Sequence, residues 1–171
     1  MVACENDQQE IDRLFNKKVA LEEAHKIESY YSDGGIVKAK LTAPLMLRST
    51  QNPIFMEFPK TLHVDFYDDS TRIETILDAR YAKYFESEQK ILLRDSVVVV
   101  NTKTGDTLRT HELWWDQNKK EFYTDKPSRI HRPTERIFAR NGLRAAQDLS
   151  WYDFYQASGE VKTPQDMLPQ E

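Results

Sequence analysis

The chain has 171 residues, of which 39% are hydrophobic and 30% are charged, and this balance predicts one globular domain with a buried core rather than a disordered chain. The net charge of −4 excludes a strong overall attraction to nucleic acid, so no nucleic-acid partner is expected. No apolar run approaches the roughly 18 residues of a membrane-spanning helix, and a single cysteine, Cys4, excludes an internal disulfide.

The first residues are similar to the end of a bacterial lipoprotein signal peptide. They place a small residue directly before Cys4, in the sequence MVAC, and the polar stretch ENDQQE follows. In a lipoprotein, the signal peptide is cleaved at this point and the cysteine is acylated. We therefore expect a lipid on Cys4; the alternative is a chance cysteine that has no lipid.

The chain divides into three parts by its pattern. Residues 1–24 are interpreted as a signal remnant and tether, because residues 5–24 show only a weak helical period that fits either a short helix or a tether. Residues 25–159 are predicted to form the folded domain. Residues 160–171, with two prolines among polar residues, are expected to form a flexible tail.

Short extended segments with turn residues between them fill the predicted domain. Residues 27–31 precede SDGG, a strong turn signal, and in residues 36–43 apolar and polar side chains alternate with the period of a half-buried strand. The same pattern predicts further strands over 61–67, 71–84, 91–100, 107–115, 121–125, 136–140 and within 141–156. With no helix expected after residue 27, this pattern indicates an antiparallel sandwich or an open barrel.

Two adjacent tryptophans lie in the predicted hairpin 107–125. Neighbouring side chains of a strand point to opposite faces, so one of Trp114 and Trp115 should point into the core. The other is expected on the outer face, where a partner or the loop 44–60 would cover it.

Six segments from residue 27 to about residue 159 resemble the LptC family of lipopolysaccharide-export proteins. They are YYSDGGIVKAKLTAP (30–44), DARYAKY (78–84), LRDSVVV (93–99), GDTLRTHELWWD (105–116), FYTDKP (122–127) and NGLRAAQDLSWYDF (141–154). Their order and spacing cover about three-quarters of the chain. One departure is Asp95, at which members of the family commonly have glycine.

The resemblance implies a fold, a cargo and partners. The fold would be a twisted, boat-shaped antiparallel β-jellyroll with open sheet edges. The protein would be a periplasmic, membrane-anchored component that receives the lipid A part of lipopolysaccharide from the inner-membrane ABC transporter and passes it to the periplasmic bridge protein. We expect the lipid on Cys4 to supply the anchor. The transporter-facing edge is placed near 27–43, including Val37 and Ala39, and the bridge-facing edge near 141–156, including Gly142 and Leu143.

A groove for acyl chains would be lined by large apolar side chains at alternating positions of the strands. The candidates are Leu41, Met46, Leu62, Val64, Phe66, Tyr81, Leu93, Val97, Val99, Leu113, Trp115 and Phe122. The alternative is that these residues form an ordinary sandwich core. If Phe122 lines an open groove, Phe122→Glu should cost less than about 2 kcal/mol of stability, because the charge can reach water.

Nothing in the sequence predicts an enzyme, a cofactor or a metal site. The four histidines lack the spacing of metal ligands, and His63 with Asp65 fits a solvated sheet face. Seven basic residues between 126 and 144 form either a solvated face or a rim that meets lipid A phosphates: Lys126, Arg129, His131, Arg132, Arg136, Arg140 and Arg144. Two other functions stay open, a lipoprotein that acts as an interaction scaffold and a small-lipid-binding barrel.

Overall fold

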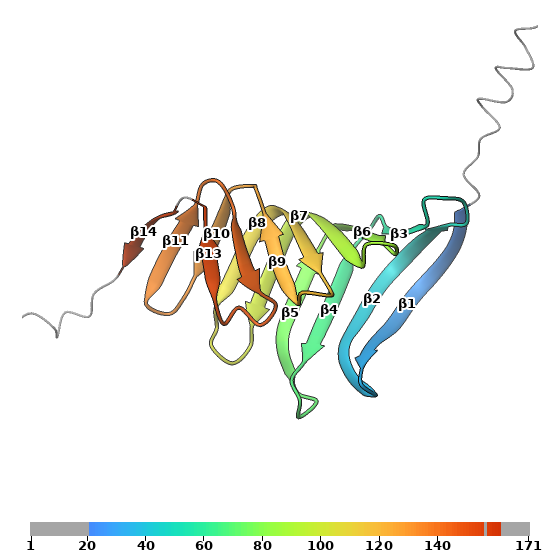
Figure 1. The fold of residues 1–171 in the computed structure, drawn as a ribbon, viewed down its shortest axis with the longest axis horizontal. Helices are drawn as coiled ribbons and strands as arrows, with labels where there is room; N and C mark the ends of the chain where they lie inside the picture. The colour runs from blue at the N-terminus through green and yellow to red at the C-terminus, as the bar shows by residue number, and fades with distance from the viewer. Residues whose placement is uncertain (1–20, 156, 162–171) are drawn as a thin grey trace, which may run out of the picture.

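The computed structural model describes residues 21–155 and 157–161, and in these ranges it consists of strands and turns without a helix. Cys4 and the possible helix within 5–20 lie outside the described residues. The strands are β1 (Leu21–Asp33), β2 (Ile36–Ser49), β3 (Phe55–Phe58), β4 (Leu62–Tyr67), β5 (Ile73–Ala79), β6 (Tyr81–Phe85), β7 (Lys90–Asn101), β8 (Thr107–Asp116), β9 (Glu121–Thr124), β10 (Ser128–His131), β11 (Glu135–Ala139), β12 (Leu143–Ala146), β13 (Tyr152–Phe154) and β14 (Ala157–Val161). The predicted all-β, antiparallel class is confirmed (Figure 1).

All strands belong to one antiparallel sheet that is divided into two halves. Long strands pass from one half to the other: residues 98–101 of β7 pair with β5, whereas residues 90–94 pair with β6. In the same way β8 pairs with both β10 and β9, and β2 pairs with both β4 and β3. We call β4, β5, β10, β11 and β14 half-sheet I, and β3, β6, β9, β12 and β13 half-sheet II. The strands β1, β2, β7 and β8 are shared.

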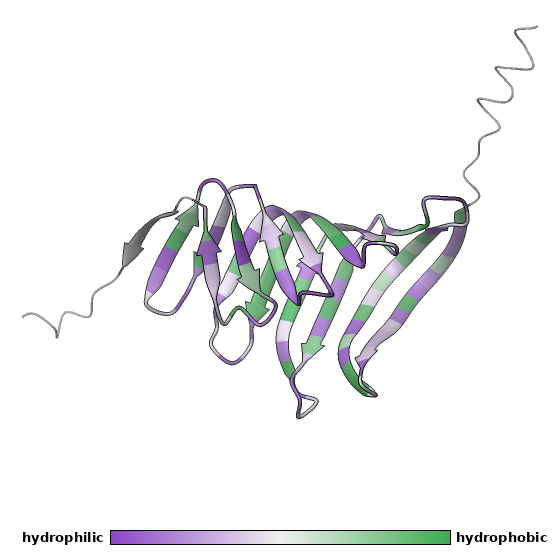
Figure 2. Ribbon diagram, viewed as in Figure 1, coloured by the Kyte–Doolittle hydropathy of each residue, from purple (hydrophilic) through white to green (hydrophobic). Residues whose placement is uncertain are grey.

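The inner faces of the two half-sheets enclose the core. Phe66 of half-sheet I packs edge-on against Trp115 of β8, with ring centroids 4.8 Å apart, and against Phe122 of half-sheet II at 6.1 Å. Along β4 the predicted alternation is confirmed, because Leu62, Val64 and Phe66 are buried while the residues between them are not. Figure 2 shows this alternation as green and purple bands along the strands.

The predicted strand 71–84 is interrupted at Arg80, where the chain leaves half-sheet I for half-sheet II. The backbone N–H of Arg80 donates a 3.0 Å hydrogen bond to the carbonyl of Asp95, which lies in a bulge of β7. Because of this interruption, the alternation of inward-facing and outward-facing side chains is displaced by one residue after Arg80. Ala82 is therefore buried, and Tyr81 does not continue the inward row of Leu77 and Ala79 as the uninterrupted pattern predicted.

The two tryptophans of the hairpin point to opposite faces, as predicted. Trp115 is 3% exposed and belongs to the core, whereas Trp114 lies half-buried on the outer face. Trp114 stacks between Phe85 and Tyr123, with ring centroids 5.8 and 6.3 Å away. Residues of the neighbouring strands β6 and β9 therefore cover Trp114, and the loop 44–60 is not needed to cover this side chain.

Three strands have a neighbour on one side only within the described ranges. These are β1 at the N-terminal end, β13 at the end of half-sheet II and β14 at the end of half-sheet I. β1 begins at Leu21, inside the range 1–24 that the sequence assigned to a tether, and β14 extends to Val161, inside the predicted tail. The sheet is thus open at both ends, as Figure 1 shows.

Candidate functional site: an apolar cavity between the half-sheets

An apolar cavity of about 330 Å³ lies where the hairpin of β1 and β2 meets β3, β6 and β7. The large apolar side chains that line it come from seven strands: Ile27, Leu41, Met46, Met56, Phe58, Val64, Tyr84, Ile91 and Trp115. Their strands alternate apolar and polar residues, so each strand turns one row of side chains inward. Several of these side chains, including Leu41, Met46 and Met56, are only partly buried although they pack against the core. The interior is therefore not closed at this end.

The polar groups in this cavity are few and uncharged. Burial raises the pKa of the Tyr84 phenol, with a smaller contribution from the nearby Glu86, so the phenol stays neutral at physiological pH. The remaining polar groups belong to Ser29, Tyr30, Tyr31, Gln89 and Gln117. An apolar space with a few neutral groups suits a hydrocarbon chain, whose binding needs no fixed polar geometry.

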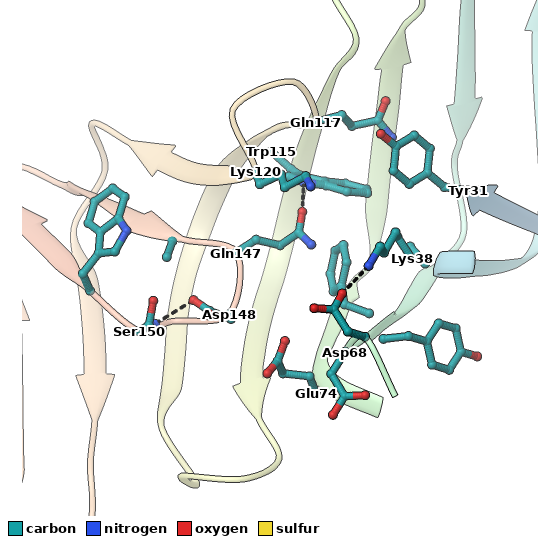
Figure 3. A pocket seen from close by; sticks show the side chains of 16 residues that line it. Tyr31, Lys38, Asp68, Glu74, Trp115, Gln117, Lys120, Gln147, Asp148 and Ser150 are labelled. Carbon is teal, nitrogen blue, oxygen red and sulfur yellow. Dashed lines mark hydrogen bonds and ion pairs between the residues drawn. The ribbon is translucent and has the colours of Figure 1, made fainter. Parts of the chain in front are cut away.

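A second, polar cavity of about 440 Å³ adjoins the first (Figure 3). Both cavities are lined by Tyr31, Ala39, Trp115 and Gln117. The polar cavity lies among the turn after β4, the turn after β8 and the loop between β12 and β13. At its inner wall, the indole N–H of Trp115 donates a 2.9 Å hydrogen bond to the side-chain oxygen of Gln147. This bond links the core tryptophan to the loop that follows β12.

Ion pairs connect the tip of the β1–β2 hairpin to the turns around the polar cavity. Lys38 of β2 lies 2.6 Å from Asp69 in the turn between β4 and β5. Lys120, in the turn between β8 and β9, lies 3.3 Å from Asp33 at the end of β1. We call these two pairs the hairpin contacts. They hold the edge hairpin against both half-sheets.

Asp68 adds a fixed negative charge to the same cavity. Its carboxylate accepts hydrogen bonds from the backbone N–H groups of Arg72 and Ser70 at 3.0 and 2.9 Å, and Lys103 lies 2.9 Å away. The hydrogen bond from the Arg72 backbone, followed by the bond from Lys103, holds the pKa of Asp68 well below its usual range. Asp68 lies in the turn between the two predicted strands 61–67 and 71–84, a position at which aspartate is common.

The predicted groove residues fall into three groups. Leu41, Met46, Val64 and Trp115 line the apolar cavity, and Phe66 lines the polar one. Leu62, Leu93, Val97, Val99, Leu113 and Phe122 are at most 1% exposed and line neither cavity. Tyr81 is hydrogen-bonded to Glu57, and burial followed by this bond raises the pKa of Tyr81 to about 12.

Five of the large apolar side chains that line this cavity were missed by the sequence interpretation: Ile27, Met56, Phe58, Tyr84 and Ile91. Ile27, Tyr84 and Ile91 belong to segments that were predicted as strands, so the alternation along these segments could have identified them. Met56 and Phe58 belong to β3, a four-residue strand close to Pro53 and Pro59. So short a segment beside prolines gives almost no strand signal.

The residues proposed for the partner edges lie one strand inside the sheet. β1 pairs with β2 on the side of Val37 and Ala39, and Ala39 also pairs with Phe66 of β4. Leu143 pairs with Thr124 of β9 and with Phe154 of β13. Gly142 lies in the turn before β12. Within the described ranges the open edges are β1, β13 and β14. β1 and β13 fall at least partly inside the predicted edge ranges 27–43 and 141–156, whereas the residues named for these edges lie on the neighbouring strands or in a turn.

The basic residues between 126 and 144 are distributed over both half-sheets, with Arg129, His131 and Arg136 on β10 and β11 and Arg144 on β12. Arg132 pairs with Glu135 at 2.9 Å and lies over the ring of Tyr152, and Arg144 pairs with Asp153 at 3.4 Å. His63, on the outer face, lies between Asp78 at 2.7 Å and Asp65 at 3.0 Å. Within the described ranges, no group of His, Cys, Asp and Glu side chains is arranged to hold a metal ion.

The chain matches the model of a known protein family. The family model described as "Lipopolysaccharide-assembly, LptC-related" matches residues 18–149, which is more than half of the chain. No curated protein sequence matches this chain. Among residues 21–155 and 157–161, no helix is long and apolar enough to cross a membrane.

Proposed function

The chain belongs to the LptC-related family of lipopolysaccharide-assembly proteins, periplasmic components of lipopolysaccharide transport, and from this we propose that it binds lipid A in the apolar cavity and relays it. In this proposal the protein receives lipopolysaccharide from the inner-membrane ABC transporter and passes it to the periplasmic bridge protein.

The apolar cavity between the half-sheets is the observation on which this proposal rests. It opens beside the edge hairpin and is lined by apolar side chains from seven strands. At about 330 Å³ it lies near the lower end of the roughly 300–1,000 Å³ found for small-molecule sites. A lipid with several acyl chains therefore needs more space, and we propose that the β1–β2 hairpin moves outward to provide it.

The open edges support docking at both ends of the molecule. An unpaired strand exposes a row of N–H and C=O groups that can pair with a strand of another protein. We propose that β1 faces the transporter and that β13 and β14 face the bridge protein. This keeps the order of the two partners inferred from the sequence. Within the ranges 27–43 and 141–156 it places the contacts on β1 and β13 rather than on the residues first named, and it adds β14.

Photocrosslinking tests cargo and docking separately. A photoreactive residue at Leu41 should capture lipopolysaccharide, whereas the same residue at Tyr81, outside both cavities, should not. A photoreactive residue at Glu28 of β1 should capture the transporter, and one at Asp153 of β13 should capture the bridge protein. The control is a photoreactive residue at Glu57 of β3, which has strands on both sides and should capture neither partner. Capture of lipid at Tyr81 but not at Leu41 would refute the cavity as the binding site.

We also propose that Cys4 is acylated and anchors the protein to the membrane. The observation behind this is the small residue before Cys4 and the polar stretch after it. Radiolabelled palmitate should enter the full-length gene product and be lost in Cys4→Ala. Labelling that persists in Cys4→Ala would contradict this assignment.

A further inference from the structure

Two arginines lie directly opposite each other on the outer face of the sheet, where β8 and β10 pair. The register places Arg129 of β10 beside Arg109 of β8 and, on its other side, beside Phe138 of β11. Leu108 and Ile130, the next residues in these strands, are buried, so both arginines point away from the core and are exposed. This places them on the opposite face of the sheet from the apolar cavity.

No described carboxylate neutralises this pair. Among the residues that the structure places, neither Arg109 nor Arg129 has an ion pair or a side-chain hydrogen bond, whereas Arg94 on the adjacent strand pairs with Glu112 at 2.8 Å. Like charges that face each other directly across two strands destabilise a sheet. Two unpaired guanidinium groups in register therefore concentrate positive charge that a bound anion would neutralise.

The arginines border a depression of about 560 Å³. His111 and Ser96 supply further polar groups, and Pro127 and Phe138 form an apolar part of the wall. The bulge of β7 helps to shape it, because Asp95 and Ser96 have no partner in the ladder between Arg94 and Val97. Asp95 pairs with His111 at 3.3 Å but does not itself line the depression.

We propose that this depression binds a phosphate group of a phosphate ester. Two guanidinium groups can each donate paired hydrogen bonds to phosphate oxygens, and the Ser96 hydroxyl is a further donor. Pro127 and Phe138 provide an apolar contact for the carbon side of the ester. The inference does not depend on the lipid cavity, which lies on the other face.

Thermal unfolding of the full chain tests the site with inorganic phosphate as the probe. At pH 7 and equal ionic strength, sodium phosphate should raise the Tm more than sodium chloride does. The affinity taken from a phosphate titration should fall about tenfold or more in Arg109→Gln and in Arg129→Gln, because each loses charge-assisted hydrogen bonds. Arg140→Gln, with the same change of charge in the turn after β11, should keep the affinity.

Vesicle binding identifies the source of the phosphate. Sedimentation with vesicles that contain phosphatidylglycerol, but not with pure phosphatidylcholine, and its loss in Arg129→Gln would assign the site to a lipid headgroup. A phosphate effect on Tm without vesicle binding would assign it to a soluble phosphate ester. Equal stabilisation by phosphate of the parent protein, Arg109→Gln and Arg129→Gln would overturn the proposal. Both variants remove a like-charge contact, so they should remain folded in chloride.

Discussion

Asp95 adopts a backbone conformation that most residues avoid, with φ of 61°, and Ser96 follows with φ of 54°. This left-handed region is open to glycine and is reached more easily by aspartate than by most other residues. Members of the resembled family commonly have glycine at this position, and the positive φ gives a reason for it. The bulge lies where β7 passes between the half-sheets, so the local conformation helps to redirect the whole strand.

Gly142 permits a close approach of two chain segments. It has φ of +92°, and a Cβ atom there would lie 2.7 Å from the Cα atom of Asp125. We expect Gly142→Ala to lower the free energy of unfolding by more than about 2 kcal/mol, since it adds a backbone clash to an unfavourable φ. Gly105→Ala is the matched control, because φ is +77° there but the space around it is open. Urea unfolding that gives equal losses for the two variants would contradict the role of the clash.

Substitutions at Phe122 and Leu41 distinguish a residue of the closed core from a residue of the open cavity. Phe122 is 0% exposed and lines neither cavity, so we now expect Phe122→Glu to cost about 3–5 kcal/mol or to prevent folding, contrary to the groove expectation. Leu41 is half-buried and lines the apolar cavity. Leu41→Glu should cost less than about 2 kcal/mol while it abolishes lipopolysaccharide crosslinking. Urea unfolding and lipopolysaccharide crosslinking, measured on both variants, would test these two expectations. A folded Phe122→Glu variant would indicate that the groove extends to β9.

His63 makes stability depend on pH. Burial alone would lower the pKa of His63, but the carboxylates of Asp78 and Asp65 outweigh burial and raise it above the usual value. The resulting stabilisation is complete below the unfolded-state pKa of about 6.5 and is lost as the pH rises through the higher folded-state pKa. The urea midpoint of the parent protein should therefore fall between pH 6 and pH 8 by more than that of His63→Gln. Identical pH profiles would exclude this contribution.

At the scale of elements, β1 is an edge strand with little support from the rest of the fold. β1 pairs only with β2, and nearly all of its side chains are exposed. Its other links to the body of the protein include the hairpin contacts, which lie at the surface and are screened by salt. Such an element is well placed to open without unfolding of the whole domain.

Hydrogen exchange measures this opening. Amides of β1 should exchange faster than amides of β7 and β8, whose strands have neighbours on both sides. Lys120→Ala removes the contact with Asp33 and should speed exchange in β1 while the exchange of β7 stays unchanged. Lys119→Ala, in the same turn and without an ion pair among the described residues, is the control. Protection of β1 equal to that of β7 would argue against a mobile hairpin.

At the scale of the whole molecule, the shared strands join the half-sheets into one unit. β7 and β8 each contribute residues to both halves, and Phe66 links the two inner faces through Trp115 and Phe122. Neither half can lose its strands without disrupting the other. The body of the domain is therefore expected to unfold cooperatively even if the edge hairpin opens locally.

Two optical probes test this cooperativity. Tryptophan fluorescence is dominated by Trp114 and Trp115 near the junction and by Trp151 near the C-terminal end, whereas far-ultraviolet circular dichroism reports on all strands. The two signals should give coincident urea transitions, as two-state unfolding requires. Separate midpoints would indicate that the half-sheets unfold independently.

The sequence by itself determined the class of the fold and most of its strands. Alternation along 61–67 and 107–115, together with turn residues between the segments, was sufficient because strand period and turn chemistry are local properties. The same alternation identified Leu41, Met46, Val64 and Trp115, which line the apolar cavity. The family was also recognisable from the order of the segments, and the match over residues 18–149 confirms it.

Only the tertiary structure decided which inward-facing residues line a cavity and which strands form the edges. Leu41 and Phe122 follow the same alternating pattern, but only Phe122 is covered from the opposite half-sheet, and that packing joins residues far apart in the chain. The same holds for Tyr81, whose orientation depends on a backbone contact between Arg80 and the distant Asp95. Contacts of this kind depend on how the long strands bend and pair, which a local pattern does not encode.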